Sequence, residues 1–107
     1  MSTYRFDNDI LSIGYYFNED ENIAEVYHFE ITQEYRNRKY GSLALETIEY
    51  ISYILGMEGL RIKIGTENNN SKQFLQSHEY TITDETDSLV TAEKRFENPN
   101  PKLTTKT

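Results

Sequence analysis

The first third of the chain alternates apolar and polar positions in two neighbouring runs. Residues 10–17 place an apolar or aromatic side chain at every second position, which is typical of a strand with one buried face. These side chains are Leu11, Ile13, Tyr15 and Phe17. The short polar cluster at 18–22 then predicts a hairpin, so residues 23–32 are expected to pair antiparallel with the first strand. Strict alternation places Glu25, Tyr27, Phe29 and Ile31 on one face of this second strand, and His28 on the other.

The middle of the chain changes to a helical period. Ala44, Ile48, Ile51 and Leu55 follow steps of four, three and four, which predicts a helix from Tyr40 to Leu55. Gly56 can end this helix in the left-handed conformation. A strand at 60–65 follows, and a strand-helix-strand order predicts a crossover between parallel strands.

The last part of the chain predicts one short helix and a closing hairpin. Asn69 or Asn70 can cap a helix that carries Phe74 and Leu75 and ends near Ser77. Strands near 80–83 and 89–96 are joined through a polar turn. We therefore expect a single α+β domain over residues 1–96, with a mixed sheet and two helices in the order strand-strand-helix-strand-helix-strand-strand. Residues 97–107 hold both prolines and no apolar period, which predicts a mobile tail.

Composition narrows the range of functions. The 107 residues carry a net charge of −7, which argues against a nucleic-acid binder. The acidic surface either keeps a small protein soluble or steers a basic acceptor toward it, such as a lysine-bearing protein or a polyamine. With no cysteine and two histidines, we expect no metal site. The apolar runs are too short to span a membrane and the N-terminus does not resemble a signal peptide, so we expect a cytoplasmic protein.

A basic turn lies between the second strand and the first helix. Arg36, Arg38 and Lys39 bring three of the 11 basic residues into four positions, directly before the expected helix start. The first N–H groups of a helix lack intrahelical partners and attract anions. A strand, a cationic turn and a helix start in this order indicate a site for a phosphate-bearing ligand. A solvated turn rich in Arg and Lys would have the same sequence pattern.

The turn and its surroundings resemble the GNAT-type N-acetyltransferases. The sequence Arg36-Asn37-Arg38-Lys39-Tyr40-Gly41-Ser42 is similar to their coenzyme A pyrophosphate loop, with Lys39 in place of the first glycine. The Ala24-Glu25 step before the loop and the segment from Asn68 to Leu75 after the next strand also resemble family elements, so the likeness covers roughly residues 10–96. It implies the carboxyl-terminal three-quarters of that fold, without the helix pair that normally helps to wall the acceptor site. That site is then open or completed by a second subunit in a homodimer.

The resemblance implies a set of cofactor-binding residues. The loop and the helix start would hold the pyrophosphate of acetyl-coenzyme A through Arg36, Arg38, Lys39, Tyr40, Gly41 and Ser42. Phe29 and Ile31, with the backbone between them, would meet the pantetheine arm. Asn68 resembles the asparagine beside that arm, and equally reads as a turn or cap residue. Lys39 resists the backbone conformation that glycine permits, but its ammonium could pair with a phosphate.

The catalytic groups follow from the same resemblance. Glu25 matches the glutamate that acts as a general base in the histone-modifying branch, and it also reads as an ordinary strand carboxylate facing water. Many relatives carry, where this chain has Leu75, a tyrosine that acts as the general acid for the departing thiolate. Tyr80 is the nearest substitute in sequence, although aromatic residues in a small domain mostly belong to the core.

The resemblance implies an N-acetyltransferase that transfers acetyl from acetyl-coenzyme A to a primary amine, on a protein rather than a metabolite. Two alternatives stay open: a degenerate binding or regulatory module, and a small viral or mobile-element effector that modifies or blocks one host protein.

Overall fold

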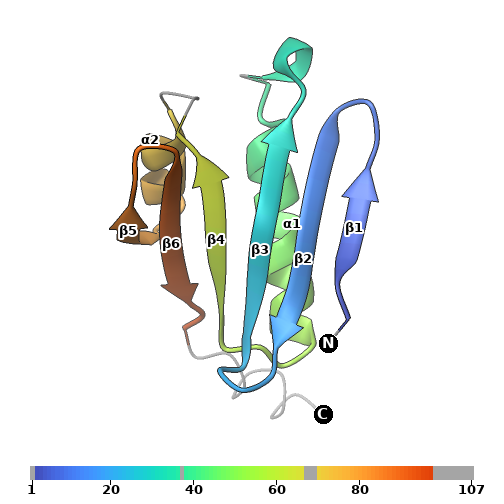
Figure 1. Cartoon of the computed structure of the whole chain (residues 1–107). Helices are drawn as coiled ribbons and strands as arrows, with labels where there is room; N and C mark the ends of the chain where they lie inside the picture. Colours follow the sequence, from blue (N-terminus) through green and yellow to red (C-terminus); the bar gives the residue numbers. More distant parts are fainter. Residues whose placement is uncertain (1, 37, 67–69, 98–107) are drawn as a thin grey trace.

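The computed structural model describes residues 2–36, 38–66 and 70–97 and shows one mixed sheet with two helices on a single face (Figure 1). The strands are β1 (Tyr4–Asp7), β2 (Leu11–Asn18), β3 (Ile23–Ile31), β4 (Gly59–Gly65), β5 (Thr81–Glu85) and β6 (Leu89–Arg95). The helices are α1 (Tyr40–Ile54), α2 (Ser71–Ser77) and a single 3₁₀ turn, η1 (Gln33–Tyr35). The predicted α+β class and element order are therefore confirmed, with one additional strand at the N-terminal edge.

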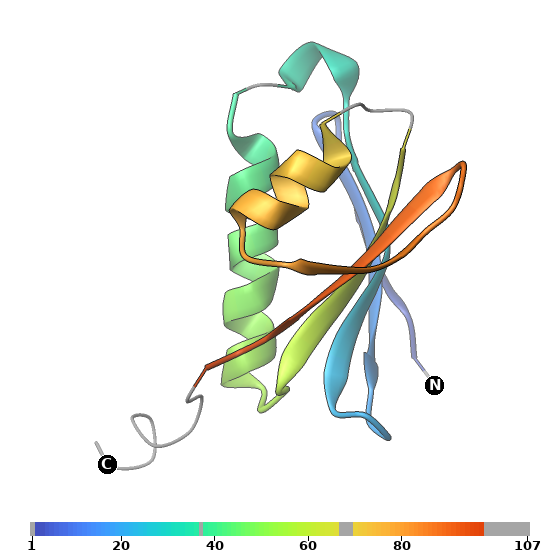
Figure 2. The same cartoon turned by 90° about the vertical axis from the view of Figure 1, so that its left-hand side faces the viewer.

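The strand order in the sheet is β1-β2-β3-β4-β6-β5. Every neighbouring pair is antiparallel except β3 and β4, which are parallel because α1 crosses between them. Figure 2 shows α1 and α2 on the same side of the sheet, which leaves the opposite face uncovered. The expected hairpin between β2 and β3, the crossover through α1 and the closing hairpin are all present.

The core lies between the helices and the central strands. Ile62 on β4, Leu45 on α1 and Leu75 on α2 are completely buried there. Burial of such a side chain stabilises the fold by about 1.5–3 kcal/mol. Gly56 ends α1 in the left-handed conformation with φ +91°, as predicted.

The parallel ladder between β3 and β4 is short. It pairs Ile23 with Gly59 and ends at the pair of Val26 and Ile62. Within the described residues, the rest of β3 pairs as a strand with β2 and not with β4, and Figure 1 shows β3 and β4 diverging beyond this point. The divergence opens a cleft between two central strands, at the end of the sheet where the basic loop lies.

A bulge in β3 corrects the predicted faces of this strand. Gly14 pairs with His28 but Tyr15 pairs with Val26, so Tyr27 is an extra residue on β3. Before the bulge Glu25 lies on the uncovered face, whereas after it Phe29 and Ile31 lie on the helix side and His28 on the uncovered side. The expectation that Glu25, Phe29 and Ile31 share a face was therefore wrong, and so was the separation of His28 from Glu25.

Strand β1 was not predicted. All four of its residues are exposed, so its side chains give no buried face that a period could reveal. It adds an outer strand through pairs such as Tyr4 with Tyr15. Within the described residues no helix is long and apolar enough to cross a bilayer. The expected tail from residue 98 onward lies outside the described residues.

Candidate cofactor site

The diverging strands enclose a cleft of about 590 Å³. Side chains and backbone of β3, the basic loop, the start of α1, β4 and α2 line it. Those from the predicted cofactor set are Phe29, Ile31, Arg36, Lys39, Gly41 and Ser42. Six predicted residues from separate parts of the sequence thus meet at one concave surface.

The start of α1 supplies backbone donors to the cleft. Lys39 occupies the N-cap position, and no side chain of the described residues makes a cap hydrogen bond there. The first bond inside the helix runs from Leu43 N to Lys39 O at 3.1 Å. The N–H groups of Tyr40, Gly41 and Ser42 precede that bond in the first turn, where α-helices leave donors for a capping group or an anion.

Lys39 itself has a left-handed backbone, with φ +68° and ψ +9°. This is the region that glycine enters freely and that costs other residues about 1–2 kcal/mol. The loop therefore has the backbone conformation that a glycine would favour, with lysine in place of the family's glycine.

The two arginines of the loop lie differently. The guanidinium Nε of Arg36 donates to Ile31 O at 2.8 Å, so this side chain folds back over the end of β3 and borders the cleft. Arg38 lies over the ring of Tyr35 at 5.8 Å, and Tyr35 packs against Tyr40 with ring centroids 5.9 Å apart. Neither Arg38 nor Tyr40 contributes to the cleft lining. The structure thus places Arg36 at the cleft and Arg38 beside it.

Gly41 faces the apolar wall of the cleft. A Cβ at this position would lie 3.5 Å from the ring of Phe74 and 3.7 Å from Ile31, both ordinary contacts. The ring of Phe74 lies 6.1 Å from that of Phe29, which joins α2 to β3. A small side chain at Gly41 is therefore compatible with the fold, whereas a large one would fill the cleft.

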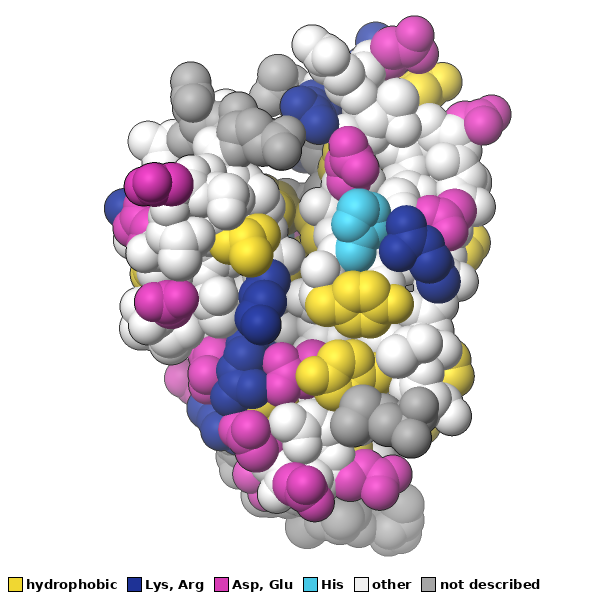
Figure 3. Space-filling view, in the orientation of Figure 1, with side chains coloured by type: hydrophobic (Ala, Val, Ile, Leu, Met, Phe, Trp, Pro, Cys, Tyr) yellow, Lys and Arg dark blue, Asp and Glu magenta, His cyan; other side chains and the backbone are white. Residues whose placement is uncertain are grey.

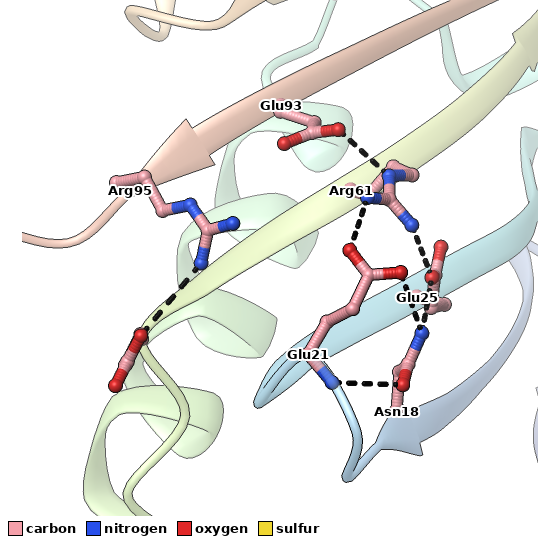
Figure 4. Close-up of polar contacts among 7 residues, drawn as sticks. Asn18, Glu21, Glu25, Arg61, Glu93 and Arg95 are labelled. Atoms are coloured by element: carbon pink, nitrogen blue, oxygen red, sulfur yellow. Dashed lines mark hydrogen bonds and ion pairs between the residues drawn. The ribbon is translucent and has the colours of Figure 1, made fainter.

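Glu25 lies below the cleft, on the uncovered face of the sheet, and belongs to a charged network (Figure 4). Its Oε2 accepts from Arg61 Nη1 at 2.5 Å and from Asn18 Nδ2 at 3.1 Å. Arg61 also donates to Glu21 and Glu93, each at 2.8 Å. The Glu25 side chain is 10% exposed and directly adjoins Val26, where the ladder ends and the cleft begins.

The hydrogen bonds of this network shift the pKa values of Arg61 and Glu21. The hydrogen bonds to Glu21 and Glu93 raise the pKa of Arg61 above its already high ordinary value, so this guanidinium stays charged. The hydrogen bond from Arg61 lowers the pKa of Glu21. Glu25 therefore faces a permanent cation on the neighbouring strand.

Tyr80 lies away from the cleft. It is 4% exposed, and its hydroxyl donates to Glu49 Oε2 at 2.7 Å, while Lys94 Nζ lies 5.5 Å from its ring centroid. Burial, and then the negative charge of Glu49, raise the pKa of Tyr80 strongly. Tyr80 does not line the cleft, and Leu75 is completely buried in the core. Asn68 lies outside the described residues.

The uncovered face carries polar and aromatic side chains beside the cleft. Figure 3 shows basic and acidic groups interspersed over this face, with hydrophobic side chains between them and a hollow where β3 and β4 diverge. His28 lines the cleft and its Nε2 lies 3.8 Å from Glu30. The rings of Tyr16 and Tyr27 are 6.2 Å apart. Among the described residues no cluster of three or more His, Asp or Glu side chains could hold a metal ion.

No protein-family model matches the sequence, and no curated protein does either. Solved structures do match. PaiA N-acetyltransferase from Thermoplasma acidophilum, in complex with coenzyme A, superposes with a TM-score of 0.69 at 23% identity, over 81% of this chain and 54% of that one. A GNAT-family acetyltransferase from Staphylococcus aureus gives 0.68 at 14% identity, over 80% of this chain and 59% of that one.

The fold is that of the GNAT-type N-acetyltransferases. An IAA acetyltransferase from Bacillus cereus agrees, with a TM-score of 0.71 at 11% identity over 88% of this chain and 77% of that one. This chain spans a little over half the length of the first two GNAT structures. The likeness inferred from the loop, the Ala24-Glu25 step and the second helix is thus confirmed at the level of the fold.

Sequence reasoning missed His28, which lines the cleft, and His78, which contacts the cleft residue Ser42 from the end of α2. The strand bulge hid the position of His28. The contact of His78 with Ser42 joins residues 36 positions apart, and only the packing of α2 on α1 brings them together.

Proposed function

We propose that this protein is an N-acetyltransferase that binds acetyl-coenzyme A and transfers the acetyl group to a primary amine, most suitably a lysine of a protein. The observation that carries this proposal is the cleft between β3 and β4, which leads directly to the N-terminus of α1, where no side chain of the described residues provides a cap. A helix start supplies N–H donors for phosphate, and a strand edge supplies a ladder for an amide-bearing chain.

Each part of the coenzyme has a matching part of the cleft. The N–H groups of Tyr40, Gly41 and Ser42 would hold the pyrophosphate, with Arg36 and Lys39 adding positive charge. The edge of β3 from Phe29 to Ile31 would hold the pantetheine arm, whose amides match backbone donors and acceptors. In this orientation the thioester end of the coenzyme would point toward Val26, where the parallel ladder of β3 and β4 ends.

The reaction needs a proton acceptor. When bound, acetyl-coenzyme A supplies an acetyl group activated as a thioester. Glu25 would take a proton from the acceptor ammonium, so that the free amine can form the new N–C bond as the C–S bond breaks and the thiolate leaves. The proton that the new amide nitrogen then loses passes to the thiolate through solvent. Asn18 and Arg61 hold the Glu25 carboxylate in place on the face where an acceptor can approach. The buried position of Tyr80 supports no role in protonating the thiolate.

The acceptor would approach the uncovered face of the sheet. This face is broad and carries several acidic side chains, including Glu21, Glu30 and Glu93. An open face with several carboxylates suits a lysine on a protein better than a small metabolite, which needs enclosing walls. A second subunit in a homodimer could supply such a wall.

A coenzyme-binding protein without turnover is the second candidate. The ion pair of Glu25 with Arg61 favours it, because the carboxylate must give up or share that partner to act as a base.

Calorimetric titration with acetyl-coenzyme A tests cofactor binding, and mass spectrometry after incubation with a lysine-rich protein mixture tests transfer. A mass gain of about 42 Da on a lysine corresponds to one acetyl group. This gain should appear with the unaltered chain and be strongly reduced when Glu25 is replaced. Binding without any acetylated lysine selects the non-catalytic candidate. Absence of binding at millimolar coenzyme contradicts both.

A further inference from the structure

Three polar side chains form a row from the cleft to the surface. The hydroxyl of Ser42 lies 2.9 Å from Nε2 of His78, and Nδ1 of His78 lies 3.9 Å from Oε2 of Glu46. Ser42 and Glu46 are one turn apart on α1, so they face the same way. His78 is the C-terminal cap residue of α2. The row therefore links the end of one helix to the beginning of the other.

The row is held rigidly at its centre. The His78 side chain is 13% exposed, and its ring lies 5.0 Å from that of Phe74, which lines the cleft. Its backbone N–H donates to Leu75 O. The imidazole is thus fixed by packing on one side and by Ser42 on the other.

The protonation of His78 Nε2 decides whether the Ser42 hydroxyl can donate a hydrogen bond to a ligand in the cleft. If Nε2 of His78 is bare, the Ser42 hydroxyl donates its proton to it and turns its lone pairs outward. If Nε2 carries a proton, His78 donates to Ser42, and the hydroxyl proton is free for another acceptor. Because Nδ1 faces the Glu46 carboxylate at 3.9 Å, a proton on Nδ1 is favoured in both arrangements, so the change at Nε2 adds one proton to the ring. A phosphate oxygen at the start of α1 requires the second arrangement.

We propose that His78 is a positioning residue for the coenzyme phosphates, and that binding of the coenzyme at Ser42 is coupled to uptake of a proton by His78. The inference rests on the proposed function, because it places the pyrophosphate at the start of α1. Glu46 faces the second ring nitrogen and stabilises a positive charge on the ring. Histidine is the side chain whose charge most readily changes near neutral pH.

The other charged groups near His78 are accounted for within the described residues. Glu49 on α1 is engaged by Tyr80 and Lys94, and Lys72 on α2 pairs with Glu85. Glu79 follows His78 in the chain, and Lys39 stands at the N-cap of α1. Glu46 is therefore the carboxylate that the structure brings within 4 Å of the ring.

The test is calorimetric titration in two buffers of different ionisation enthalpy, which gives the number of protons taken up per ligand bound. The ligand is 3′-dephospho-coenzyme A. It keeps the pyrophosphate but lacks the 3′-phosphate monoester, whose own titration at about pH 6 would add to the measured proton uptake. The proteins are the unaltered chain, His78→Gln and Ser42→Ala, with Thr47→Ala as the matched control. Thr47 is exposed on the same helix and its hydroxyl donates to Leu43 O.

We expect the unaltered chain and Thr47→Ala to take up a fraction of a proton for each ligand bound. His78→Gln keeps a donor for Ser42, so it should bind within about threefold but lose that uptake. Ser42→Ala should bind about tenfold more weakly and also lose it. Equal uptake in the unaltered chain and His78→Gln would overturn this inference alone. No binding by any of the proteins would overturn the proposed function as well.

Discussion

Glu25 and Arg61 are paired directly across the parallel β3–β4 ladder, and their side chains meet at 2.5 Å. The contact joins the proposed general base to a permanent cation at the point where the two strands begin to diverge. The same guanidinium holds Glu21 and Glu93, so Arg61 organises the face below the cleft. Catalysis and stability are therefore expected to respond differently to changes at these two residues.

Replacement of Glu25 by Gln should leave coenzyme binding intact and reduce acetyl transfer by about a hundredfold or more, because an amide cannot accept the proton. Binding is measured by calorimetry and transfer by mass spectrometry at neutral pH. Glu19→Gln is the control, since Glu19 is an exposed carboxylate of the turn between β2 and β3 and does not line the cleft. Unchanged transfer by Glu25→Gln would assign the base to another group, with His28 the next candidate by position.

Replacement of Arg61 by Leu should destabilise the fold by about 3 kcal/mol at pH 7, because it leaves the nearly buried Glu25 carboxylate without its partner. Urea denaturation measures this loss. Arg95→Leu removes a much more exposed contact with Glu58 and should cost below about 1 kcal/mol.

The effect of Arg61 should depend on pH with a definite sign. Because the hydrogen bond from Arg61 lowers the pKa of Glu21 below its ordinary value of 4.5, this contact stabilises the fold above that pH and is lost as the pH falls below it. The difference between the unaltered chain and Arg61→Leu should therefore narrow in acid. A difference that stays constant from pH 7 to pH 3 would contradict the assigned network.

Lys39→Gly should stabilise the fold by about 1 kcal/mol, because glycine adopts the left-handed backbone at this position without strain. Lys39→Ala removes the same ammonium but keeps the strain, so it serves as the control. If the ammonium pairs with a phosphate, both variants should bind coenzyme A more weakly than the unaltered chain. If Lys39→Ala binds like the unaltered chain and only Lys39→Gly binds differently, the backbone conformation, and not the charge, governs the loop.

Gly41→Trp should abolish coenzyme binding while the protein stays folded, because the side chain projects toward Phe74 and Ile31 in the cleft. Gly41→Ala is the matched control and should increase stability by about 0.5 kcal/mol, as expected for a helical position without a close contact. Circular dichroism and calorimetry check the two effects. Full affinity in Gly41→Trp would mean that the coenzyme does not reach the start of α1.

Tyr80→Phe should destabilise the fold by about 1–2 kcal/mol, since it removes the buried hydrogen bond to Glu49, and it should leave coenzyme binding and transfer unchanged. Because the pKa of Tyr80 is raised, its contribution is present at neutral pH and declines above about pH 10, where tyrosines of the unfolded chain ionise. Loss of transfer with intact binding would restore Tyr80 as the proton donor.

The parts of the fold that follow a period could be predicted from the sequence. Ala44 and Ile48 define the buried side of α1, and Gly56 marks its end. The loop before α1 was found because its charges and its Gly41-Ser42 step lie together in the sequence. Lys39 adopts the left-handed backbone that the glycine of the resembling loop suggests, although a lysine side chain disfavours that conformation.

The missed features depend on contacts between distant segments. At the bulge the Tyr27 ring lies over Gly14 on the neighbouring strand, where an added Cβ would come within 2.6 Å of it. One extra residue reverses the faces of the remainder of β3. The pairing of Arg61 with Glu25 spans 36 positions, so neither residue reveals the other locally.

The most direct test of the account is an NMR titration of the ¹⁵N-labelled protein with acetyl-coenzyme A. The account predicts that the largest shifts occur at the backbone amides of Gly41, Ser42 and Ile31, with little change at Tyr53 and Phe96, which pack together near the C-terminal end of α1. No shifts at millimolar ligand, or shifts centred on Tyr53 and Phe96, would contradict a coenzyme site between β3 and β4.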